Sequence, residues 1–146
     1  IPVTAKSQKQ IFDAVVAETL GEDCAYEVVR NLHDNLYEMM EEHKENPEPL
    51  ELSKMDVKKL LEKSGAPEEK MEVFDAEFDT VAGEKTTLLA SNVVNVKKFS
   101  VETPDIVIKV NPERADLLET MEFEGRKCLV IAIDDHVEVN GVTVRV

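Results

Sequence analysis

The chain has 146 residues, of which 31 are acidic and 17 are basic, so its formal net charge is −14. A surface with this excess of carboxylates repels the phosphates of nucleic acids and of anionic membranes, and we expect neither as a partner. No apolar run reaches the about 20 residues of a membrane-spanning helix, and Ile1 does not begin a signal peptide, which together indicate a cytoplasmic protein.

The negative charge is concentrated in the first half of the chain. Residues 1–80 carry 9 basic and 20 acidic side chains, whereas residues 81–146 carry 8 and 11. The hydrophobic spacing changes from helical to alternating near the same place, so we expect a helical subdomain over 1–82 and a β-sheet subdomain over 83–146 that share one core. A first residue that is Ile1 rather than Met indicates a fragment of a longer chain.

The first predicted helix runs from Thr4 or Ser7 to Leu20. Ser7 and Gln10 have the spacing of a capping box, in which each side chain satisfies a free backbone amide of the other residue. Apolar residues then recur every three or four positions, as on the buried stripe of an amphipathic helix. Gly21 follows as a left-handed stop.

The second predicted helix begins at Glu22 and Asp23, where negative charge suits the helix dipole, and ends before the stiff connector 46–49. Its apolar face comprises Ala25, Val28, Val29, Leu32, Leu36 and Met39. Its acidic face comprises Asp34, Glu38, Glu41, Glu42 and Glu45. A run of charge of this kind is typical of a solvated face, and it could also dock a basic protein.

Two further helices are predicted before the pattern changes. The third begins at Ser53, which has Asp56 three residues later as a capping partner, and stops at Gly65. The fourth begins at Pro67, which suits the first turn of a helix, and ends at Gly83. We expect the following residues 84–95 to be a connector.

Strands are predicted in the remaining third of the chain. Phe99 and Val101 lead into an alternating strand over 106–110, and a short helical turn follows over 112–118. The next two strands, 120–124 and 127–133, form a predicted hairpin. Because the second of these is apolar on both faces, we expect it to be central in a sheet.

The last predicted hairpin turns at Asn140-Gly141, since both residues tolerate the positive φ angles of a type I′ turn. A two-residue loop places Val139 opposite Val142 and pairs the valines at 137 and 144. These valines are expected to face the core, together with Val146, which leaves His136 on the outer face. The whole pattern predicts an α+β fold: four helices, then a mostly antiparallel sheet of five to six strands with helices on one face.

Catalytic motifs are weak. Asp134, Asp135 and His136 could hold a divalent metal or move a proton, although a polar turn between strands has the same composition. The two histidines of the second helix, His33 and His43, are ten residues apart and do not share a metal-binding face.

No cofactor is expected, because 83–87 lacks the second glycine of a phosphate-binding loop. Cys24 and Cys128 form no metal-binding pattern and are interpreted as reduced core thiols.

Seven short stretches together resemble a known family. They are Ile1–Lys6, Tyr26–Arg30, Gly83–Thr86, Leu88–Asn92, Glu102–Asp105, Val110–Arg114 and Val137–Gly141. Over the whole chain they resemble the C-terminal part of an uncharacterised bacterial family, domain-of-unknown-function family 4317. The resemblance implies a longer cytoplasmic bacterial protein, and it brings no known activity and no catalytic residues.

Two functions are consistent with these patterns. The first is a non-catalytic module that binds a basic protein or assembles with itself, based on the acidic helix face and the lack of a catalytic constellation. The alternative is a metal-assisted hydrolase that uses Asp134, Asp135 and His136. The sequence leaves the enzyme question open and favours the first.

Overall fold

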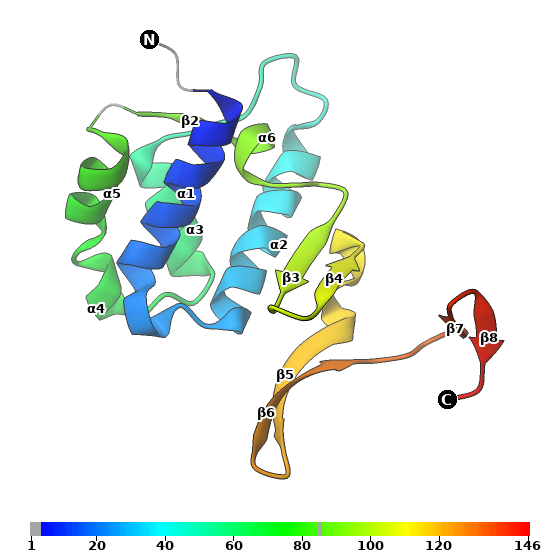
Figure 1. The fold of residues 1–146 in the computed structure, drawn as a ribbon. Coiled ribbons are helices and arrows are strands. Elements are labelled where there is room, and N and C mark those ends of the chain that lie inside the picture. Colours follow the sequence, from blue (N-terminus) through cyan, green and yellow to red (C-terminus); the bar gives the residue numbers. More distant parts are fainter. Residues whose placement is uncertain (1–3, 85) are drawn as a thin grey trace. The chain divides into compact units, whose positions relative to one another are not determined.

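A computed structural model describes residues 4–84 and 86–146 of the chain. The chain divides into two compact units, Ile1–Pro112 and Glu113–Val146. The first unit holds all the α-helices described, and the second is built mainly of two hairpins (Figure 1).

The first unit opens with α1 (Ala5–Leu20), a 3-10 turn η1 (Gly21–Asp23) and α2 (Tyr26–His43). The N-cap of α1 is Thr4, whose hydroxyl accepts the backbone N–H of Ser7 at 3.1 Å. The earlier of the two predicted starts is therefore confirmed, and the Ser7–Gln10 capping box is wrong. Gly21 ends α1 at φ +52°, as predicted, but α2 starts four residues later than expected because the 3-10 turn intervenes.

Three shorter helices follow: α3 (Lys54–Lys63), α4 (Glu68–Met71) and α5 (Phe74–Ala82). The predicted capping box at the start of α3 is confirmed, since the Ser53 hydroxyl accepts the Asp56 N–H at 3.2 Å and the Asp56 carboxylate accepts the Ser53 N–H at 2.9 Å. The fourth predicted helix is two helices. The helix is interrupted between Met71 and Phe74, and both of these side chains are buried.

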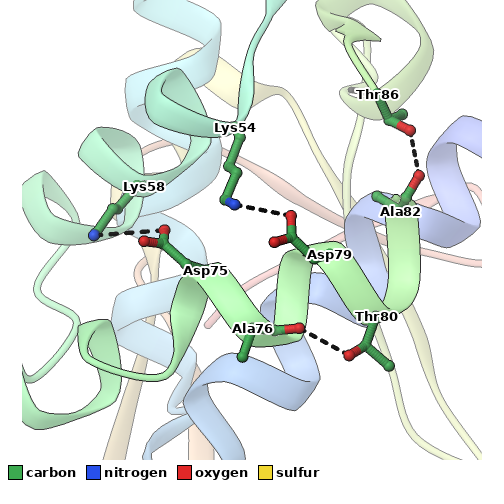
Figure 2. Close-up of polar contacts among 8 residues, drawn as sticks. All are labelled: Lys54, Lys58, Asp75, Ala76, Asp79, Thr80, Ala82 and Thr86. Carbon is green, nitrogen blue, oxygen red and sulfur yellow. Dashed lines mark hydrogen bonds and ion pairs between the residues drawn. The ribbon is translucent and has the colours of Figure 1, made fainter. Parts of the chain in front are cut away.

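Two ion pairs join α3 to α5 (Figure 2). The Lys54 ammonium lies 2.8 Å from the Asp79 carboxylate, and Lys58 lies 3.6 Å from Asp75. The two lysines are four residues apart on α3, and the two aspartates are four residues apart on α5. Each helix therefore presents its charges along one face. The hydrogen bond to Asp79 raises the pKa of the Lys54 ammonium above its ordinary value.

The helices surround one hydrophobic core. Its largest fully buried side chains include Phe12, Phe74, Phe78, Leu32, Leu36 and Leu61. The segment expected to be a connector also enters this core, because it contains strand β2 (Leu88–Leu89) and helix α6 (Ala90–Val93). Strand β2 pairs antiparallel with β1 (Glu51–Leu52), which sequence reasoning also missed. The predicted subdomain boundary at 82/83 stays a prediction.

The first unit also contains a hairpin of β3 (Phe99–Glu102) and β4 (Val107–Val110). Its register pairs Phe99 with Val110 and Glu102 with Val107. The loop between the strands is closed by the Thr103 N–H, which donates to the Ile106 carbonyl at 2.8 Å. Both strands lie where alternation predicted extended chain.

The second unit begins with a 3-10 segment, η2 (Pro112–Leu117), whose first residue belongs to the first unit. The first hairpin pairs β5 (Leu118–Phe123) with β6 (Arg126–Ile131), and the second pairs β7 (Val137–Val139) with β8 (Val142–Val144). The predicted turn and register of the last hairpin are confirmed, with φ +48° at Asn140 and +85° at Gly141.

The single sheet of five to six strands is not present in the part of the chain that the structure describes. The strands form four separate two-stranded antiparallel pairs. Among the residues that the structure describes, strand β6 pairs only with β5, so the prediction that it is central is wrong. The predicted core-facing valines are also wrong: Val139 and Val142 are exposed, and within the second unit their hairpin is a separate two-stranded pair.

Candidate functional site

The acidic face predicted on the second helix is exposed, although its last member, Glu45, follows the end of α2 at His43. Asp34, Glu38, Glu41, Glu42 and Glu45 are all exposed. One of the five, Glu41, forms an ion pair with Lys44 at 3.4 Å, between two side chains that are both largely exposed. Such a pair contributes little to stability. The face can therefore act as a negative surface that attracts cations over about a Debye length.

The second predicted site, Asp134, Asp135 and His136, lies in the second unit, between β6 and β7. The Asp134 carboxylate is 2.9 Å from the Arg114 guanidinium, which also bonds Asp116 at 3.2 Å. The hydrogen bond to Asp116, followed in size of effect by the one to Asp134, raises the pKa of the Arg114 guanidinium above its ordinary value.

The imidazole of this triplet lies among carboxylates. His136 Nδ1 is 3.5 Å from Asp135, and its Nε2 is 3.3 Å from the Glu138 carboxylate. Among the described residues, no group of three or more His, Cys, Asp and Glu side chains is placed to hold a metal ion.

We expect divalent metal to leave the thermal midpoint unchanged, within about 1 °C. A metal at 100 times its dissociation constant would add about 2.7 kcal/mol, or roughly 5 °C or more in a chain of this size. Differential scanning fluorimetry with Zn²⁺, Mg²⁺ and Mn²⁺ measures the shift. A stabilisation that disappears in Asp134→Asn/Asp135→Asn would contradict this expectation and support the hydrolase.

A groove that the sequence did not reveal lies in the first unit, between α2 and β3. It has a volume of about 510 Å³. One wall consists of Tyr26, Val29 and His33, which follow one another at three and four residues and so share a face of α2. The opposite wall consists of the four consecutive residues of β3, Phe99–Glu102.

Aromatic contacts hold the two walls together. The buried Phe99 ring meets Tyr26 and His33 edge to face, at centroid distances of 6.3 and 6.1 Å. Such pairs stabilise by about 0.5–1.5 kcal/mol beyond the area they bury. The His33 Nδ1 lies 3.0 Å from the Val29 carbonyl, so this nitrogen carries the proton and donates. The imidazole is therefore fixed in one orientation.

Cys24 also lines the groove. It is exposed, so the prediction of a core thiol is wrong for this residue, while Cys128 is half-buried; neither forms a disulfide. Partial desolvation raises the pKa of the Cys24 thiol. The protonated thiol is therefore the form present at neutral pH, and it is a poor nucleophile.

The second unit has an unusually apolar exterior. Ala115 and Leu118 are the only buried side chains among residues 113–146, all of which the structure describes. The large exposed apolar side chains are Met121, Phe123, Val130, Ile131, Ile133, Val139, Val142, Val144 and Val146. Phe123 is 60% exposed and Val142 64%. Large apolar patches that remain exposed mark sites of protein association.

Comparison with known proteins gives one result. The family model described as Domain of unknown function (DUF4317) matches residues 1–142 of the 146. The chain belongs to the DUF4317 family. The resemblance predicted from the seven short stretches is therefore confirmed. No curated protein and no solved structure matches the chain.

Within the described residues of this DUF4317 chain, no helix is long and apolar enough to cross a membrane. Sequence reasoning located the acidic face and the exposed His136 but missed the groove. Two signals for the groove were available: the spacing of Tyr26, Val29 and His33, and the pair Lys97-Lys98 in an otherwise acidic chain. Neither signal shows which strand lies opposite α2, because tertiary contacts bring the strand and the helix together.

Proposed function

We propose that this DUF4317 chain is a non-catalytic module that binds a basic protein. The observation that carries the proposal is the apolar exterior of the hairpins β5–β6 and β7–β8. An isolated two-stranded hairpin is at best marginally stable in water and needs a third strand or another packed layer. Covering a Val, Ile or Phe side chain contributes about 1.5–3 kcal/mol, so a partner that covers several of them gains substantial affinity.

The net charge of the chain favours a different protein, rather than a second copy of the chain, as the partner that covers the hairpins. Each copy carries a net charge of −14, so two copies repel one another at low salt. A basic partner is attracted by the same charge, and the exposed acidic face of α2 adds to this attraction. Nucleic acid and anionic membranes are excluded by the same sign of charge. We also propose a cytoplasmic location, since free cysteines stay reduced in the cytoplasm.

The oligomeric state provides the first test. We expect a monomer at low salt by size-exclusion chromatography with light scattering, because the like charges are least screened there. A stable dimer or larger assembly at low salt would show that a second copy, rather than a basic protein, covers the hairpins.

The second test uses variants of β7–β8. The wild-type chain should capture proteins whose isoelectric points, once they are identified, lie above neutrality, and the double variant Val139→Ser/Val142→Ser should not capture them. High salt should weaken the wild-type complexes. Thr143→Ser, on the opposite face of the same hairpin, is the matched control and keeps them. The measurement is quantitative mass spectrometry of captured proteins, with circular dichroism to verify folding. Equal capture by the double variant, or capture of acidic proteins only, contradicts the proposal.

A further inference from the structure

The edge of β3 that faces away from β4 has unused backbone groups. In the described chain β3 pairs only with β4. The Thr103 N–H bonds the Ile106 carbonyl, and hydrogen-bonded pairs alternate along an antiparallel ladder. Phe99 and Val101 therefore bond across to β4, whereas Ser100 and Glu102 direct their N–H and C=O groups to the other edge.

This free edge borders the groove. Ser100 and Glu102 both line it, whereas no residue of β4 does. Figure 1 shows β3 on the side of β4 that is nearer α2, so the free edge lies on the helix side of the hairpin. A strand edge opposite a helix face is the arrangement that accepts an added strand, since main-chain hydrogen bonds supply affinity and side-chain pockets supply specificity.

The charged residues at the two ends of β3 determine which ligand side chains the groove favours. Lys98 precedes the strand and Glu102 ends it, four residues or about 13 Å apart, on the same face as Ser100. The loop before the strand is set by Asn95, whose side-chain oxygen accepts the backbone N–H groups of Lys97 and Lys98. Phe99 and Val101 project to the other face, toward the apolar wall of α2.

We propose that this groove binds an extended peptide segment that adds to β3 as a third, antiparallel strand. The bound segment has a basic side chain opposite Glu102, apolar side chains opposite Val101 and Phe99, and an acidic side chain opposite Lys98. Its middle residue exchanges both backbone hydrogen bonds with Ser100. This site is independent of the hairpins β5–β6 and β7–β8, so it goes beyond the proposed function and stands or falls separately.

The test is an NMR titration of the ¹⁵N-labelled chain with the peptide acetyl-Lys-Val-Thr-Val-Glu-amide. We expect the amide protons of Ser100 and Glu102 to move downfield and to exchange more slowly, because they gain hydrogen bonds. The amides of Phe99 and Val101, which already bond β4, change less. Failure of the Ser100 and Glu102 signals to move at millimolar peptide overturns the proposal.

Two sets of variants separate strand addition from non-specific contact. N-methylation of the peptide's threonine removes a hydrogen bond to β3 and abolishes binding, whereas N-methylation of its second valine, whose N–H points away, is tolerated. Lys98→Glu weakens binding about fivefold. Lys109→Glu, on β4 opposite Ser100, makes the same charge change away from the groove and leaves binding unchanged. Equal binding of the two methylated peptides, or by the two variants, overturns the proposal.

Discussion

Replacement of Phe78 by alanine should lower the free energy of unfolding by about 3–5 kcal/mol. Phe78 is fully buried in the core between the helices, and its ring centroid lies 5.7 Å from that of Phe74. Truncation removes the buried ring and leaves a cavity that the surrounding helices cannot fill completely. Because domains of this size are stable by only about 5–15 kcal/mol, the loss is a large fraction of the total.

Urea unfolding followed by circular dichroism measures this change, since the helices belong to the first unit. Met55→Ala is the control. Met55 is on α3 and is 55% exposed, so its truncation should change the free energy of unfolding by less than about 0.5 kcal/mol. A loss below about 1 kcal/mol for Phe78→Ala would mean that α5 does not pack into the core as described.

Replacement of Gln8 by alanine should cost about 1–3 kcal/mol. Gln8 is a buried polar residue of α1, and its side-chain oxygen accepts the backbone N–H of Leu89, on β2, at 2.8 Å. The variant leaves the Leu89 N–H without its acceptor, and a partly buried donor without a partner incurs a desolvation penalty. Unfolding in urea measures the loss, and hydrogen exchange of the Leu89 amide should become faster.

Gln10→Ala provides the matched comparison, because Gln10 is on the same helix and is exposed. Its replacement should be nearly neutral. If Gln10→Ala were as destabilising as Gln8→Ala, the contact between α1 and β2 would not explain the result.

Local chemistry predicted several elements correctly. Ser53 and Asp56 form their capping box because both hydrogen bonds lie within four residues of chain. Asn140 and Gly141 form their turn because both adopt positive φ at low steric cost. Four of the five predicted acidic residues lie on α2 and are exposed, as helical spacing predicted, because they lie opposite the buried Leu32 and Leu36; Glu45 follows the end of the helix.

Non-local contacts account for the errors. The segment 84–95 looks like a connector because two residues of β2 and four of α6 are too few to produce a periodic pattern. Its side chains Leu88, Ala90 and Val93 are buried only because the segment lies against β1 and the helices. Arg114, twenty residues before Asp134, bonds that carboxylate, which is another contact that local sequence does not show.

The sequence by itself determined the acidic character, the helices of the first half, the family and the turn and register of the last hairpin. These follow from composition and from interactions over a few residues. Only the tertiary structure decided that the strands stay in separate pairs, that Val139, Val142 and Val144 are exposed, and that α2 and β3 form a groove. The physical reason is that alternation shows which residues share a face of a strand but not whether another layer covers that face.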